Sequence, residues 1–160
     1  LGWSHSRIGG FLALWIIGYG AVQALAPAVT NRPGTLPDGR AAFLWALPLA
    51  TLPAGIALAL GAGVAAEPVL VWGLLAFGAV FALNSALHSY LIVSYAREDG
   101  VSLDVGFYYM ANAAGRLLGT VLSGWVYQVA GLEACLWVSA AFVAVAAAVS
   151  VALPRHPIPA

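Results

Sequence analysis

Arg116 is the residue of this sequence whose type and position most strongly indicate chemistry. It lies in the middle of the apolar segment GFYYMANAAGRLLGTVLSGWVY and is the only charge in that segment. The segment is long enough to cross a bilayer, where a charge near the centre costs at least about 2.5–3.5 kcal/mol. Asn112 precedes Arg116 by four residues, so the two share a helix face. An arginine in this place needs a partner or a polar cavity, and it predicts a functional site.

A second polar pair lies in the run LNSALHSYLIVSY. Asn84 and His88 are four residues apart there and share a face of another apolar segment. A polar cavity lined by several helices is one interpretation of these residues and Arg116. The alternative is that the side chains only bridge helices, since amides and histidine hydrogen-bond across membrane interfaces. His88 could serve as a neutral interhelical donor, a proton relay or a ligand contact.

The acidic residues are expected only in loops or at helix ends. Arg116 therefore has no embedded acid in this sequence to neutralise it, and its counter-charge is either a carboxylate upstream or an anionic substrate. This deduction points to an anion pathway. The embedded helices also offer a metal no carboxylate and no second histidine near His88, so neither a metal site nor a cofactor is expected. Paired carboxylates and a serine–histidine motif are missing as well, which argues against an enzyme. The acids are Asp38, Glu67, Glu98, Asp99, Asp104 and Glu133.

Small residues recur at four-residue spacing in the segment that carries Arg116. They form one flat helix face that a neighbouring backbone could approach closely, and we predict that this face serves helix packing rather than substrate contact. Cys135 is the only cysteine, so no intrachain disulfide can form, and it is expected to be a small packing residue. The residues of the flat face are Ala111, Gly115, Gly119 and Ser123.

The composition is that of a membrane protein. Hydrophobic residues make up 62% of the 160 residues and charged residues only 8%, and the mean hydropathy is +0.94. Too little polar surface remains to solvate a globule of this length. The formal net charge is zero and no basic run occurs, so the sequence gives no field that would attract nucleic acid.

Five hydrophobic segments, each near or above the roughly 20 residues that a spanning helix needs, are bounded by glycine, proline or charge. Exposed backbone groups find no water in the hydrocarbon, so these segments must be helices. The predicted fold class is an all-α polytopic membrane protein with about five transmembrane helices. The segments run from about Ile8 to Val29, Ala41 to Gly61, Pro68 to Ala96, Val105 to Val129 and Leu132 to Leu153.

The loop arginines predict the orientation. Four of them fall on one side of the segments, whereas only Arg7 falls on the other, and such a bias marks the cytoplasmic side. The C-terminus is therefore expected in the cytoplasm and Leu1 outside. A chain that starts outside without a signal peptide suggests that at least one helix precedes it. The four arginines are Arg32, Arg40, Arg97 and Arg155.

The arrangement of five helices, an inside C-terminus, the polar loop TNRPGTLPDGR and a glycine-rich penultimate helix resembles the C-terminal half of a major facilitator transporter. The segments would be helices 8–12 of that fold, and residues 1–160 a partial C-terminal transmembrane half. More specifically, GGFLALWIIGYGAVQALAP, NSALHSYLIVSYA and VGFYYMANAAGRLLGTVLSGWVYQ, followed by ACLW, resemble the organoarsenical efflux permeases of the ArsJ family. The resemblance covers most of the chain and is most distinctive around Arg116.

The resemblance implies export of 1-arseno-3-phosphoglycerate across the inner (plasma) membrane by alternating access, which gives arsenate resistance. A partner glyceraldehyde-3-phosphate dehydrogenase would make this strongly anionic substrate, and the missing N-terminal half would complete the transporter. A guanidinium pairs bidentately with phosphate-like oxygens, so Arg116 is a suitable substrate ligand, with Asn112, Asn84 and His88 as hydrogen-bonding neighbours. The alternatives are a major facilitator permease for another small molecule, such as a drug, sugar or organic anion, and a non-transporting membrane scaffold.

Overall fold

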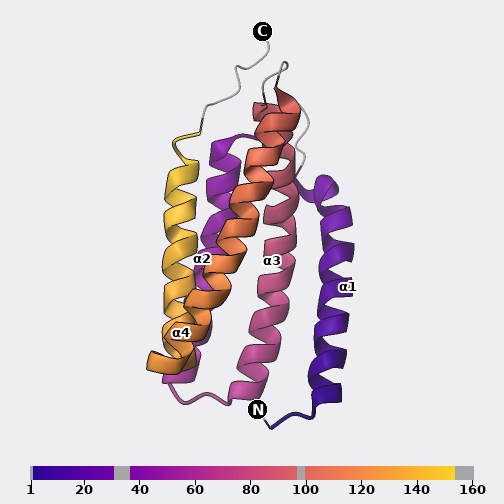
Figure 1. Cartoon of the computed structure of the whole chain (residues 1–160). Coiled ribbons are helices and arrows are strands. Elements are labelled where there is room, and N and C mark those ends of the chain that lie inside the picture. Colours follow the sequence, from indigo (N-terminus) through magenta and orange to yellow (C-terminus); the bar gives the residue numbers. More distant parts are fainter. Residues whose placement is uncertain (1, 31–36, 97–99, 154–160) are drawn as a thin grey trace.

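The computed structural model describes residues 2–30, 37–96 and 100–153. The backbone of these residues is helical almost throughout (Figure 1). The helices are α1 (His5–Thr30), α2 (Gly39–Gly61), α3 (Ala66–Tyr95) and α4 (Val101–Ser150). Each of the four is long and apolar enough to cross a membrane. The all-α fold class predicted from the sequence is thus confirmed, and the helices are those expected of a membrane protein.

Helix α4 contains a reversal of the chain at Gly131. This residue has φ 80° and ψ −174°, a backbone conformation that favours glycine because it has no Cβ. The ribbon folds back there, so the orange and yellow parts of α4 run side by side (Figure 1). We call residues 101–130 the first arm and residues 132–150 the second arm. The described residues therefore form four helices where the sequence predicts about five, and the last two predicted segments fall on the two arms of α4.

Helices α2, α3 and α4 all contact one another, the contact between α3 and α4 being the smallest, and α1 lies at the side of this group. Helix α1 packs only against α3 among the described elements, and α2 packs against both α3 and α4. Helices α1 and α3 run in the same direction, because Arg7 near the start of α1 pairs with Glu67 near the start of α3 at 2.7 Å. Helix α2 runs antiparallel to α3, since its late residue Ile56 lies against the early residue Gly73.

The tightest approach joins the start of α2 to the end of the second arm. A Cβ atom added at Gly39 would overlap the carbonyl oxygen of Ser150 and would lie 2.8 Å from Cβ of Leu153. Asp38 caps α2 at this end, because its Oδ1 accepts hydrogen bonds from the backbone N–H groups of Arg40 and Ala41 at 2.9 and 3.2 Å. The absence of a side chain at Gly39 is what allows the two helix ends to meet.

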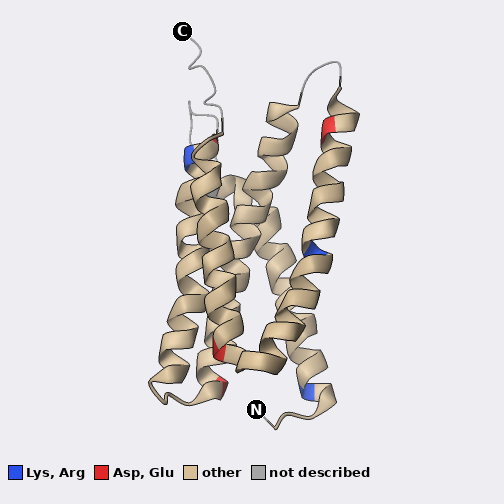
Figure 2. Cartoon of the chain, turned by 60° about the vertical axis from the view of Figure 1, so that its left-hand side comes forward, with Lys and Arg blue, Asp and Glu red and all other residues tan. Residues whose placement is uncertain are grey.

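Charges are sparse along the helices (Figure 2). The four acids within the described ranges are Asp38, Glu67, Asp104 and Glu133. The first three lie at or near helix ends, and Glu133 lies beside the reversal at Gly131, as the sequence predicts. Of the arginines used to predict orientation, Arg32, Arg97 and Arg155 lie outside the described residues. The cytoplasmic placement of the C-terminus therefore stays a prediction.

Candidate functional site

Arg116 lies halfway along the first arm of α4. It is 15 residues from Val101 and 15 from Gly131, or about 22 Å from each end at a rise of about 1.5 Å per residue. Its side chain is exposed, and it has no ion-pair partner within residues 2–30, 37–96 and 100–153. Its backbone carbonyl accepts a hydrogen bond from Oγ1 of Thr120 at 2.8 Å. The guanidinium is thus accessible to any group that lies next to this arm.

The face next to Arg116 is open in the described chain. Asn112 is exposed, as are all four residues of the predicted packing face, Ala111, Gly115, Gly119 and Ser123. A Cβ atom at Gly115 or Gly119 would meet no heavy atom within 4 Å. The packing role of this face stays a prediction. Ser123 does contact the second arm, because its carbonyl oxygen accepts a hydrogen bond from Sγ of Cys135 at 3.4 Å.

Asn84 and His88 lie on α3 in a different environment. Asn84 is 6% exposed, and its Oδ1 is buried without a hydrogen-bond partner in the described residues. His88 is only partly exposed. No hydrogen bond or ion pair joins this pair to Arg116 or Asn112 in the part of the chain that the structure describes. The structure thus places one predicted pair on α3 and the other on the first arm of α4, and whether the two share a cavity stays a prediction.

The buried amide of Asn84 gives a stability prediction. An unsatisfied buried polar group costs about 1–3 kcal/mol, so Asn84→Leu, which fills the same space without a polar atom, should raise the free energy of unfolding by about 1 kcal/mol. Thermal unfolding in detergent measures the effect. The nearby variant Ser85→Ala serves as the control, since Ser85 is only half-buried. A clear loss of stability in Asn84→Leu would show that the amide has a structural partner.

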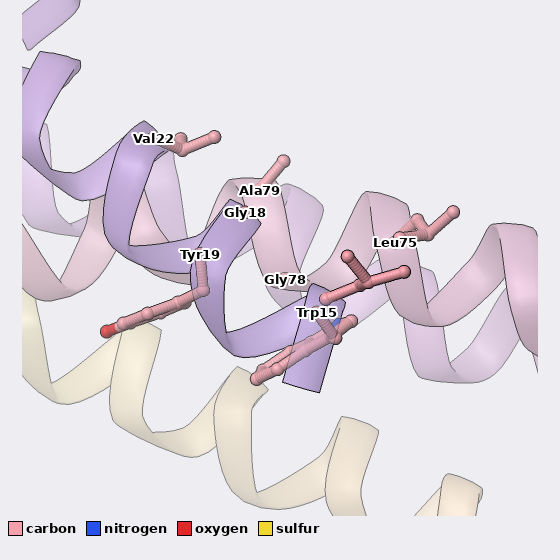
Figure 3. Close-up of a pocket in the computed structure, with 8 residues that line it drawn as sticks. Trp15, Gly18, Tyr19, Val22, Leu75, Gly78 and Ala79 are labelled. Carbon is pink, nitrogen blue, oxygen red and sulfur yellow. The ribbon is translucent and has the colours of Figure 1, made fainter. Parts of the chain in front are cut away.

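Sequence reasoning missed a contact surface between α1 and α3. Nε1 of Trp15 donates to the carbonyl oxygen of Leu74 at 2.7 Å, and the indole lies over Gly78, where a Cβ atom would come within 2.7 Å of Nε1. Tyr19 stacks on Trp15 with ring centroids 5.7 Å apart. A groove of about 180 Å³ lies beside these residues, and Figure 3 shows its lining from both helices. The pairing of α1 with α3 could not be predicted from the sequence, because the two helices are not neighbours along the chain.

No group of three or more His, Cys, Asp or Glu side chains in the described residues could hold a metal ion. Four helices of membrane-crossing length and apolarity are those expected of a helical membrane protein, and a charged side chain lies halfway along the first arm of one of them. Comparisons with protein-family models, with curated proteins and with solved structures find no match.

Proposed function

We propose that this chain is the C-terminal part of a major facilitator efflux transporter that exports an organoarsenical anion, 1-arseno-3-phosphoglycerate. The observation that carries the proposal is the position of Arg116, about 22 Å from both ends of an apolar helical arm and without an acidic partner in the described residues. A charge near the centre of a membrane has a high free-energy cost, and such a residue is by default interpreted as functional. An anionic substrate supplies the missing counter-charge.

The chemistry of the site follows from the donors that the chain offers. The guanidinium of Arg116 has five N–H donors in a planar fork that matches two oxygens of a phosphate or arsenate group. Asn112 lies one turn away on the same arm and adds an amide to the same face. In this proposal Asn84 and His88 contribute to the site from α3, where the buried Oδ1 of Asn84 has an unused acceptor position in the described residues. That acceptor suits a hydroxyl group of the glycerate part of the substrate.

Transport would proceed by alternating access, with two halves rocking around a site near the bilayer midplane. In this proposal an N-terminal half covers the open face of the first arm and closes the cavity around Arg116. A glyceraldehyde-3-phosphate dehydrogenase in the cytoplasm makes the substrate from arsenate, and the transporter, in the inner membrane with its C-terminus inside, exports it. No cofactor takes part.

The test is arsenate tolerance in a sensitive host that expresses the full-length transporter with and without the dehydrogenase. Tolerance and export of the organoarsenical that both depend on the dehydrogenase are the expected result. The full-length protein must be detected in the membrane fraction in every strain. Membrane expression without tolerance or export would overturn the arsenical substrate and leave a facilitator for another small molecule.

A further inference from the structure

The groove between α1 and α3 lies outside the proposed transport site. Its lining is apolar apart from the rims of two aromatic side chains, and both helices contribute to it (Figure 3). Among the described helices α1 packs only against α3, so none of the others covers the groove. The lining residues from α1 are Leu14, Trp15, Gly18, Tyr19 and Val22, and those from α3 are Leu75, Gly78 and Ala79.

The chemistry of this groove favours an apolar occupant. Nε1 of Trp15 already donates to the carbonyl oxygen of Leu74, so the indole offers no free donor to a polar ligand. Gly18 leaves open space, since a Cβ atom there would meet nothing within 4 Å. An apolar recess holds water poorly, and an empty one forfeits dispersion contacts along its walls. In a helix that crosses a membrane, the acyl chains of the lipid fill such a recess.

A charged group lies at the end of the same face of α1. Arg7 precedes Leu14 by seven residues and Gly18 by eleven, spacings that put all three on one side of the helix. Its guanidinium stacks over the Trp3 ring at 4.1 Å and uses one nitrogen, Nη2, for the ion pair with Glu67. The remaining N–H donors of the fork can bind a phosphate oxygen. Tryptophan and arginine near a helix end are typical of the headgroup level of a membrane.

The stretch of α1 from Arg7 to Val22 is about as long as one lipid molecule in a bilayer leaflet. From Arg7 to Val22 the helix rises about 22 Å, at about 1.5 Å per residue. One leaflet, including its headgroups, is about 20–22 Å thick, half of the roughly 40–45 Å of a whole bilayer. A phosphate at Arg7 would therefore place an acyl chain alongside Leu14, Gly18 and Val22.

We propose that the α1–α3 groove is a binding site for a membrane phospholipid, with the headgroup phosphate on Arg7 and one acyl chain between the two helices. The charge of Arg7 complements the phosphate, and the apolar lining complements the chain. This site does not depend on the transported substrate. Its occupant would support α1, which no described helix except α3 contacts.

The experiment uses the full-length protein in nanodiscs that contain a phospholipid with a photoactivatable acyl chain. Mass spectrometry of the cross-linked peptides should show labelling concentrated in the groove residues of α1 and α3, above that of Ile16 on the opposite side of α1. Gly18→Leu should remove most of the groove labelling, because its side chain fills the open space. Gly20→Leu is the matched control, since Gly20 also has no heavy atom within 4 Å of an added Cβ but faces away from the groove.

Two charge variants test the headgroup. Arg7→Gln should lower groove labelling roughly fivefold, the effect of losing about 1 kcal/mol from one exposed ionic contact. Glu67→Gln breaks the same ion pair but keeps the cation, so labelling should stay the same or rise. Circular dichroism checks that each variant is folded. Equal labelling of Ile16 and the groove, no loss in Gly18→Leu, or the same loss in Glu67→Gln as in Arg7→Gln would overturn the proposal.

Discussion

In the proposed transporter, Arg116→Gln is expected to remove nearly all arsenate tolerance while the protein still inserts into the membrane. Removing the guanidinium deletes two charge-assisted hydrogen bonds to the proposed substrate, each worth about 1.5–3 kcal/mol, so affinity should fall by a factor of about a hundred or more. Neutralising an uncompensated charge in a spanning helix does not hinder insertion. Arg116→Lys keeps the charge but not the planar fork, and it should retain partial tolerance. Export assays and membrane immunoblots measure both quantities.

The matched control for Arg116 is its neighbour Leu117. This side chain is 67% exposed, and Leu117→Ala changes the same turn of the first arm without touching the charge. We expect Leu117→Ala to leave tolerance at the level of the unmodified transporter. An Arg116→Gln transporter that is present in the membrane and confers full tolerance would disprove the substrate-binding role of Arg116 and, with it, the proposed site.

The largest stability effect is expected at Gly39. An alanine there would push its Cβ into the carbonyl of Ser150 and against Cβ of Leu153, and neither atom lies at the flexible end of a side chain. Overpacking of this kind costs about 1–3 kcal/mol, and Gly39→Val should cost more because its two methyl groups meet the same backbone. Thermal unfolding of the purified protein in detergent should show a lower midpoint for alanine and a still lower one for valine.

Gly55 gives the matched control for that experiment. It lies in the same helix, and a Cβ atom there would meet nothing within 4 Å. Alanine is favoured over glycine inside a helix by about 0.5–1 kcal/mol, so Gly55→Ala should raise the unfolding midpoint slightly. If Gly39→Ala and Gly55→Ala shift the midpoint in the same direction, the close approach of α2 to the end of α4 does not limit stability.

The sequence was sufficient to predict the helices themselves. Their length and apolarity require helices in a bilayer, and the predicted end of one segment at Val129 and start of the next at Leu132 bracket the reversal at Gly131. The central position of Arg116 could also be predicted, because depth along a helix is a matter of counting residues from its ends. Boundaries differed by a few residues: α4 begins at Val101 rather than Val105. Helix ends are set by local capping, which hydropathy does not report.

The order of the helices in space could not be predicted. Helices that are apolar on every side carry no polar face to indicate which neighbour they meet. The pairing of α1 with α3 depends instead on the fit of Trp15 over Gly78, a detail of shape. For the same reason the sequence left open whether Asn84 and Arg116 line one cavity or only bridge helices; the structure places Asn84 buried on α3 and Arg116 exposed on α4, and the shared cavity stays a prediction. Spacing along one helix determines its faces, but packing determines what those faces meet.

The reversal at Gly131 has a consequence for biosynthesis. Only one residue separates the two arms of α4, so they would leave the ribosome in quick succession and enter the translocon as one helical hairpin. The second arm has seven leucine, valine and phenylalanine residues, each favouring insertion by about 0.3–0.6 kcal/mol near the centre of a bilayer. Their sum of about 2–4 kcal/mol offsets the roughly 2.5–3.5 kcal/mol that Arg116 costs on the same scale. The apolar residues of the second arm would thus help to carry Arg116 of the first arm into the membrane.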